Sequence, residues 1–499
     1  MNKRNIRIGI LLLLFAATIF YRAYGLDSHS VADEFYEVRR ALNVLEGEFN
    51  WAKVFKGGLY ILLVPIYFVT NFFNQDYHSF LLIGRIVQVV IGIVLIACFF
   101  CILRILYRDI WALFFIIPII FHTGLIYNAH HVNVQNLMFV GVMFHLYFII
   151  KYFKTNDYKL FCMSLIPLSF AIASQISAVI FTIPFFLFSL ILVISTNRCE
   201  RIDVIKGLLK YGFISLGIYI LLTPGIVVYF KKALSDMTGL SGLSEDGSPF
   251  STVYQINPWT EYAKYIINFF GKPNLVLVVI SVIVVFIKRK WFFLYPLSIF
   301  LLFYFIFSNA SQTAYSGRYI IPGLLQGFII MPLAVVEWSD WLARYKNKNL
   351  RYFLLTIPII LIGLNFCRII FYSWENVKEY AFPDTRRLVS EWLKANTTID
   401  DRILLGNTSD APDVPFKEQA VRIDIWKTYP DLDSIDVNYV IINKSTVDYF
   451  ISKKIEVMYD DFFIDLANSE EWELVHTEKS IPDKSTGPEI RVYYHIGEL

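Results

Sequence analysis

The sequence has few charged residues and few cysteines. Charged residues make up 17% of its 499 residues, whereas soluble proteins carry about 25%. Apolar residues make up 56%. This composition excludes a soluble enzyme with a single core, a coiled coil and a disordered protein. The chain has five cysteines, none of them after residue 373, which excludes a disulfide scaffold. It has no internal repeat and no low-complexity segment.

The few charges are unevenly distributed along the chain. Residues 374–499 contain 25 acidic and 14 basic residues, a net charge of −11. Residues 1–373 contain 17 acidic and 31 basic residues, a net charge of +14. We therefore expect a long apolar domain at 1–373 and a soluble domain at 374–499. Lysine and arginine that flank apolar spans on the cytoplasmic side account for the basic charge, so we expect no nucleic-acid partner.

Residues 1–373 contain many apolar runs that are long enough to cross a bilayer. The first run, 8–24, follows three basic residues and lacks a small-residue cleavage site. We expect it to be an uncleaved helix with its N-terminus in the cytoplasm. Ten further runs lie near 81–104, 110–127, 132–150, 160–178, 179–195, 211–230, 271–287, 291–308, 318–338 and 351–373.

Two apolar runs leave the number of spans open. Without the run 59–73, which could also be re-entrant, the count is 11. The count is 13 if 59–73 spans and 110–127 is split near Pro118 into two short helices. Either odd count puts residues 25–58, 231–270 and 374–499 outside the cytoplasm. We predict a polytopic α-helical membrane protein with about 11–13 transmembrane helices, in a bacterial inner membrane.

The C-terminal region alternates helix and strand signals. A helix is expected at 384–396, and strands are expected at 402–406, 438–443, 471–477 and 490–496. These elements predict a small α/β domain outside the cytoplasm.

The first outer loop, 25–58, contains an amphipathic helix pattern at 31–46. One face carries Val31, Phe35, Val38, Leu42 and Leu45, and another carries Asp33, Glu37 and Arg40. We expect this helix to lie along the membrane surface. Asp33 and Glu34 fall in its first turn, where they could be a helix cap and a solvated neighbour. Alternatively, Asp33 could be a general base or a metal ligand, because burial near an apolar boundary can raise a carboxyl pKa.

The order of these motifs resembles the GT-C glycosyltransferases that use polyprenyl-phosphate sugars. The most similar branch contains the protein O-mannosyltransferases and the aminoarabinose transferases of lipid A. The matching positions are Asp33, Glu34, Tyr36, Ala41, Gly47, Gly58 and Tyr60, followed by a span led by Arg85, the segment RYIIPGLL at 318–325 and the helix DTRRLVSEWLKANT. The resemblance covers the apolar domain in order and the C-terminal domain loosely.

The resemblance implies a glycosyltransferase of the cell envelope. Such an enzyme transfers a monosaccharide from polyprenyl phosphate to a lipid, glycan or protein acceptor outside the cytoplasm. By resemblance, Asp33 takes the acceptor proton and Glu34 positions it or shares a divalent metal ion. The phosphate leaving group needs cations, and the candidates are Arg318, Arg85 and Lys56.

Other residues are candidates for the pocket and for a metal. Tyr36, Tyr60 and His131 are candidates for the acceptor pocket. His130 is the candidate that would join Asp33 and Glu34 at a metal, because adjacent histidines on a helix point about 100° apart and one ion cannot easily take both. The long outer loop 231–270 contains a Gly/Ser-rich segment, 235–265, which is a candidate lid over the donor.

Two other functions are compatible with a polytopic membrane protein. An oligosaccharide polymerase or ligase that uses polyprenyl diphosphate would have a larger loop between late spans and no early Asp-Glu loop. A membrane transporter would have pseudo-repeated halves and charges in the middle of its spans. The sequence shows no repeat and almost no mid-span charge, which favours the glycosyltransferase.

Overall fold

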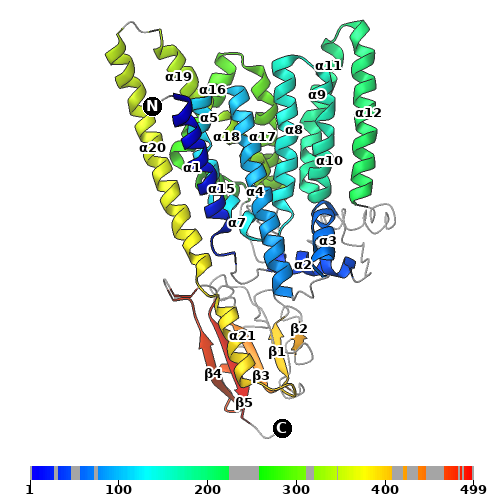
Figure 1. The fold of residues 1–499 in the computed structure, drawn as a ribbon, viewed down its shortest axis with the longest axis vertical. Coiled ribbons are helices and arrows are strands. Elements are labelled where there is room, and N and C mark those ends of the chain that lie inside the picture. Colours follow the sequence, from blue (N-terminus) through cyan, green and yellow to red (C-terminus); the bar gives the residue numbers. More distant parts are fainter. Residues whose placement is uncertain are drawn as a thin grey trace. The chain divides into compact units, whose positions relative to one another are not determined.

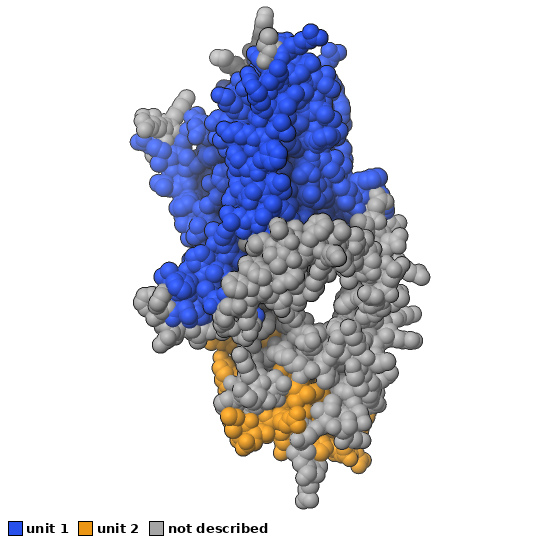
Figure 2. All heavy atoms as spheres, turned by 90° about the vertical axis from the view of Figure 1, so that its right-hand side faces the viewer, with its two compact units in different colours: residues 1–23, 40–374 blue, residues 24–39, 375–499 orange. Residues whose placement is uncertain are grey.

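The computed structural model describes most of the chain in two compact units. The described residues are 3–26, 32–45, 57–71, 77–223, 258–310, 320–344, 347–406, 420–423, 437–444, 466–481, 484–485 and 488–496. Unit 1 contains residues 1–23 and 40–374, and unit 2 contains residues 24–39 and 375–499 (Figure 2).

Unit 1 is a helical bundle (Figure 1). Its first half contains α1 (Lys3–Ala23), α3 (Gly57–Asn71), α4 (Tyr77–Leu106), α5 (Asp109–Phe115), α6 (Ile117–Ile120), α7 (Thr123–His130), α8 (Gln135–Thr155), α9 (Tyr158–Met163), α10 (Leu165–Ser174), η2 (Ile176–Phe181), α11 (Thr182–Ser195) and α12 (Arg198–Leu222). Its second half contains α15 (Pro258–Phe270), α16 (Lys272–Ile287), η3 (Trp291–Phe293), α17 (Leu294–Ala310), α18 (Ile321–Ile330), α19 (Pro332–Leu342) and most of α20 (Lys348–Lys378). Helix α2 (Ala32–Leu45) is divided between the two units.

The lengths and apolarity of these helices confirm a polytopic membrane protein. Among the described residues, eight helices are long and apolar enough to cross a membrane, or up to ten if each of two bent pairs is one span. Two shorter apolar helices, Gly58–Asn71 and Tyr158–Ser174, bring the number of apolar segments into the expected range. Large side chains such as Phe213 and Leu221 on α12 are exposed, as expected for a helix that faces lipid.

Two of the spans are broken by sharp bends. The run at 110–127 forms more than one helix, which is one of the two possibilities that the sequence left open. Asp109–Ile120 and Thr123–His130 meet at 62°. Trp259–Phe270 and Lys272–Ile287 meet at 101°, at Gly271, whose φ of 72° suits a glycine. The expected loop 231–270 therefore ends in a helix, α15.

Side chains from other helices bind the backbone oxygens at these and other helix ends. This is how broken helices are tolerated inside a membrane, where water cannot bind the freed groups. The pairs are Arg22 Nη1 with Ile120 O (3.1 Å), Ser373 Oγ with Phe121 O, His122 Nε2 with Phe269 O (3.1 Å), His145 Nδ1 with Ser164 O (2.9 Å) and Ser281 Oγ with Met331 O (2.9 Å).

Unit 2 contains a five-stranded mixed sheet. Its strands are β1 (Ile403–Gly406), β2 (Ala420–Ile423), β3 (Tyr439–Asn443), β4 (Trp472–Glu478) and β5 (Ile490–His495), in the order β2-β1-β3-β5-β4. β1 is parallel to β2 and β3, whereas β5 is antiparallel to β3 and β4. The apolar side of α21 (Thr385–Asn396), with Val389 and Leu393, packs on the sheet. The small α/β domain is confirmed, and β2 is the strand that the sequence pattern missed.

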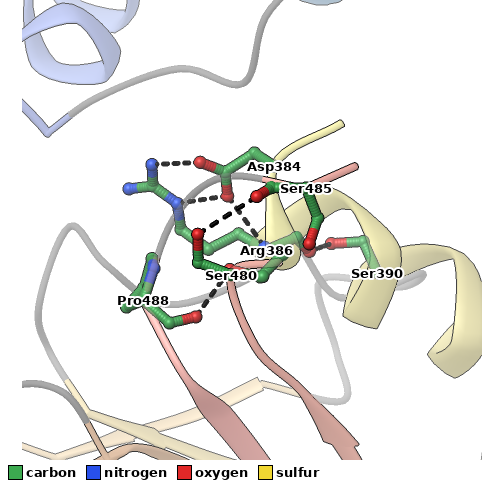
Figure 3. A network of polar contacts seen from close by, with 7 residues as sticks. Asp384, Arg386, Ser390, Ser480, Ser485 and Pro488 are labelled. Carbon is green, nitrogen blue, oxygen red and sulfur yellow. Dashed lines mark hydrogen bonds and ion pairs between the residues drawn. The ribbon is translucent and has the colours of Figure 1, made fainter. Parts of the chain in front are cut away.

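A buried ion pair fixes the start of α21 (Figure 3). Asp384 caps the helix by accepting a hydrogen bond from the backbone N–H of Arg386 (2.8 Å). The same carboxylate binds the guanidinium of Arg386 through Nε and Nη2, at 2.7 Å each. Thr385 Oγ1 donates to Pro488 O (2.7 Å), so the first turn of α21 is also bound to the segment that enters β5. The Asp384 and Arg386 side chains are only 10% and 9% exposed.

Candidate functional site

The predicted acidic residues lie at the start of α2. This helix begins at Ala32, so Asp33 and Glu34 are in its first turn, as the sequence pattern indicates. The side chains of Asp33, Glu34 and Tyr36 lie outside the described part of the structure, and so do residues Lys56 and Arg318. The roles predicted for these five residues therefore stay predictions.

Helix α2 is covered on more than one side. Glu37 is 2% exposed, and Val38 and Ala41 are fully buried. The sequence pattern assigned Glu37 to the polar face of a surface helix. The structure therefore buries a residue on each of the two predicted faces of α2, Glu37 on one and Val38 on the other. The α2 spacing contains no signal for a buried carboxylate.

A cluster of four amide side chains joins α4 to the connection between α7 and α8. It comprises Gln88, Asn128, Asn133 and Asn136. Gln88 Nε2 donates to Asn133 O (2.7 Å), and Asn136 Nδ2 donates to both Gln88 Oε1 (3.2 Å) and Asn128 O (2.7 Å). Asn133 Oδ1 accepts from the backbone N–H of Gln135 (2.9 Å), at the start of α8. This amide cluster makes a polar region inside an otherwise apolar bundle.

The two predicted histidines lie beside the amide cluster. Asn133 Nδ2 donates to His131 O (3.0 Å). His130 Nδ1 contacts Ile126 O (3.0 Å), and His131 Nδ1 contacts Tyr127 O (2.9 Å). A carbonyl oxygen only accepts hydrogen bonds, so each Nδ1 carries a proton. Nδ1 is therefore not the atom of either ring that could bind a metal.

The helical geometry assumed for this histidine pair is wrong for His131. Helix α7 ends at His130, and His131 has an extended backbone with φ −119° and ψ 143°. The two rings are therefore not related by the 100° step of a continuous helix.

The described residues do not by themselves form a metal site. Within the described ranges, no three His, Cys, Asp or Glu side chains are grouped so that they could hold a metal ion. The divalent ion that the resemblance allows would depend on Asp33 and Glu34, and it stays a prediction.

Two other predicted site residues lie on described helices: Tyr60 on α3 and Arg85 on α4. Arg85 is fully buried on α4, three residues before Gln88 of the amide cluster. Tyr60 is half-buried on α3. Gly58, two residues earlier, packs directly on α10: a Cβ at this position would lie 2.5 Å from Ser174 Oγ and 3.1 Å from Ser174 N. The glycine of the Gly-Gly-x-Tyr motif therefore allows a close approach of two helices.

Two buried polar residues, Arg22 and His122, are not among the predicted site residues. Arg22 is at the end of α1, is 1% exposed, and has two nitrogen atoms, Nε and Nη2, without a hydrogen-bond partner among the described residues. His122 lies at the bend between α6 and α7 and contacts Phe269 at the other bend, with ring centroids 4.0 Å apart. In the sequence, the only sign of these residues is their polarity within apolar runs. Arg22 lies near the end of the run 8–24, and His122 lies inside the run 110–127.

Comparisons with known proteins identify the fold. No protein-family model matches the chain, and neither does any curated protein. The fold is similar to that of the Archaeoglobus fulgidus oligosaccharyltransferase in its apo form, with a TM-score of 0.57 and 10% identity over 90% of this chain and 71% of that one. It is also similar to the same enzyme tethered by a disulfide to an acceptor peptide that contains an NVT sequon. There the TM-score is 0.54, with 11% identity over 97% of this chain and 74% of that one.

These similarities define a class by fold. The class is that of helical membrane proteins in which a small C-terminal sheet domain follows the helical region. The solved structures that share this fold include those of an oligosaccharyltransferase. At 10–11% identity, the likeness concerns the fold, and the activity has to be argued from the residues.

Proposed function

We propose that this protein is an integral membrane glycosyltransferase of the GT-C type. It transfers a monosaccharide from a polyprenyl-phosphate donor to a lipid, glycan or protein acceptor on the extracytoplasmic side of a bacterial inner membrane, with its N-terminus in the cytoplasm. The observation that carries this proposal is the fold shared with an oligosaccharyltransferase over 90% or more of this chain. Coverage this broad includes residues of both the helical region and the C-terminal domain.

The proposed reaction is a displacement at the anomeric carbon of the donor sugar. An acceptor hydroxyl or amide attacks this carbon, and the bond between the carbon and the phosphate oxygen breaks. Asp33 takes the proton of the acceptor, and Glu34 orients Asp33 or the acceptor. The start of α2 at Ala32 places Asp33 and Glu34 on consecutive positions of one helical turn, and the assignment of their roles rests on the resemblance.

The leaving polyprenyl phosphate needs positive charge around it. We assign this role to Arg318, Arg85 and Lys56. The burial of Arg85 supports its inclusion, because a guanidinium shielded from water forms stronger charge-assisted hydrogen bonds with a phosphate. Tyr36, Tyr60 and His131 would line the acceptor pocket. The proton on His131 Nδ1 favours a role for its Nε2 as hydrogen-bond acceptor.

A second candidate is the transfer of an oligosaccharide rather than a single sugar. The structural relative is named an oligosaccharyltransferase, and one of its structures holds an acceptor peptide. This observation favours a lipid-linked oligosaccharide donor, including a polyprenyl diphosphate, and a protein acceptor. In both candidate functions a sugar is transferred from a polyprenyl carrier in the membrane. They differ in whether the donor carries a monosaccharide or an oligosaccharide.

A donor panel distinguishes the two candidates. The purified chain would be reconstituted in lipid vesicles with radiolabelled polyprenyl-phosphate monosaccharides or polyprenyl-diphosphate oligosaccharides. A membrane extract and an NVT-containing peptide would serve as acceptors. We expect transfer from at least one monosaccharide donor. Transfer only from oligosaccharide donors would establish the second candidate, and no transfer from any donor would contradict both.

A further inference from the structure

The guanidinium of Arg22 is held inside unit 1, and no carboxylate of the described residues forms an ion pair with it. Its Nη1 donates to Ile120 O at 3.1 Å and lies 3.5 Å from Thr18 O. Its Nε and Nη2 have no hydrogen-bond partner, and no ion pair joins Arg22 to a carboxylate among the described residues. Arginine stays charged in proteins, so a full positive charge is buried here with two of its nitrogens unsatisfied.

The surroundings of Arg22 are built to accommodate its side chain. Gly92 on α4 faces it, and a Cβ at Gly92 would lie 3.1 Å from Arg22 Cδ and 3.2 Å from Nε. The same Cβ would lie 3.2 Å from the Cβ of Ala129 on α7. Three helices therefore leave space for the arginine through small residues and backbone. A larger residue at Gly92 would displace the guanidinium.

Holding the helix bend does not require this charge. At the next residue of the same bend, Phe121 O accepts a hydrogen bond from the neutral side chain of Ser373. A serine or threonine could bind Ile120 O in the same way. Retaining a buried, uncompensated arginine instead costs stability, which is typical of an ionisable group in a membrane that serves a ligand.

Aromatic rings of α1 and α20 lie at the same helix bend that Arg22 binds, since Arg22 contacts Ile120 and Tyr21 contacts Phe121. Phe20 stacks on Trp374 with ring centroids 5.9 Å apart, and Tyr21 contacts both Trp374 (6.3 Å) and Phe121 (4.8 Å). Phe20 is 46% exposed on a helix that the bundle covers little, so these rings border the lipid. A buried cation beside lipid-facing rings fits a molecule with an anionic head and an apolar chain.

We propose that Arg22 binds the phosphate group of a membrane lipid, through Nε and Nη2, with the lipid chain against Phe20, Tyr21 and Trp374. If the proposed function holds, this lipid is the polyprenyl-phosphate donor or the polyprenyl phosphate released from it. The phosphate of an ordinary phospholipid headgroup has the same chemistry. The experiment therefore separates these two sources.

Binding of radiolabelled polyprenyl phosphate tests this site without any transfer reaction. The full chain would be placed in nanodiscs of zwitterionic lipid, with polyprenol as the neutral probe and phosphatidylglycerol as competitor. We expect Arg22→Gln to weaken polyprenyl-phosphate binding about tenfold or more and to leave polyprenol binding unchanged. Gly92→Ala should weaken it less, because it keeps the charge but displaces Nε. Arg22→Lys should restore part of the loss.

Ser373→Ala is the matched control, since it removes a hydrogen bond from the same bend without changing the charge. It should bind polyprenyl phosphate as the wild type does. Wild-type binding by Arg22→Gln, or an equal loss in Ser373→Ala, would overturn the proposed site. Equal displacement by phosphatidylglycerol would overturn its assignment to the donor. Arg22-dependent binding in a protein that transfers no sugar would contradict the proposed function and leave this site standing.

Discussion

The two units of this protein hold a buried arginine in opposite ways. In unit 2, Arg386 forms a two-point ion pair with Asp384, and the same carboxylate caps α21. In unit 1, Arg22 binds a backbone oxygen and has two nitrogens without a partner among the described residues. The first arrangement is complete within the protein, whereas the described part of unit 1 supplies no anion to the second. The comparison indicates that Arg386 serves the fold and that Arg22 serves a ligand.

The largest expected effect on stability comes from breaking the complete pair. Asp384→Ala removes the helix cap and leaves the Arg386 guanidinium buried without its carboxylate. We expect unit 2 to lose about 3–5 kcal/mol of unfolding free energy. Thermal unfolding of the purified chain, together with limited proteolysis of the C-terminal domain, would measure this loss.

A second ion pair on the same helix provides the control for this prediction. Arg387 Nε lies 3.0 Å from Glu391 Oε1, but the two side chains are 49% and 57% exposed. Glu391→Ala should change stability by less than about 1 kcal/mol, because water screens an exposed pair. Equal losses in Asp384→Ala and Glu391→Ala would contradict the structural role assigned to the buried pair.

The next largest effect on stability concerns the distance between packed elements. In unit 2, the apolar side chains of α21 separate this helix from the sheet. In unit 1, α3 approaches α10 closely, because Gly58 has no side chain at the contact. Gly58→Ala should cost about 1–3 kcal/mol, because the new Cβ would collide with the Ser174 backbone and side chain. Gly217→Ala, on α12 with nothing within 4 Å, should be neutral or stabilising by up to about 1 kcal/mol. The two midpoints of thermal unfolding in detergent would show the difference.

The smallest expected effect is the most informative for the comparison. Arg22→Met removes one hydrogen bond but also removes an uncompensated buried charge. The two effects offset, so we expect the free energy of unfolding to stay within about 1 kcal/mol of wild type. Arg386→Met should cost about 3 kcal/mol, because it leaves the Asp384 carboxylate buried without its ion-pair partner, with only the backbone N–H of residue 386 to bind it. Similar losses in both variants, measured by thermal unfolding, would contradict the distinction between the two arginines.

Most of the architecture could be predicted from local patterns in the sequence. Apolar runs of sufficient length mark the spans, because each run reflects contact with lipid along a single helix. Alternating residues mark four of the five strands. The fifth, β2, has only four residues, AVRI, which is too short for an alternating pattern to stand out.

Bends and buried polar groups could not be predicted in the same way. Arg22 binds Ile120, which is 98 residues away, and His122 binds Phe269, which is 147 residues away. Such contacts depend on packing between distant helices, which one sequence does not encode locally. The same reason explains Glu37, whose burial depends on what covers α2. The roles predicted for Asp33 and Arg318 came from resemblance to a family.

Sugar transfer by wild type and by Asp33→Asn tests the central claim most directly. Both proteins would be reconstituted with the donor panel, and donor binding and folding would be measured in parallel. Asp400→Asn, which changes an exposed carboxylate in unit 2, is the control. We predict that Asp33→Asn folds, binds donor and loses about 100-fold to 10,000-fold in transfer rate, as expected when a general base is removed. Equal transfer by wild type and Asp33→Asn would contradict the assignment of Asp33 as the base.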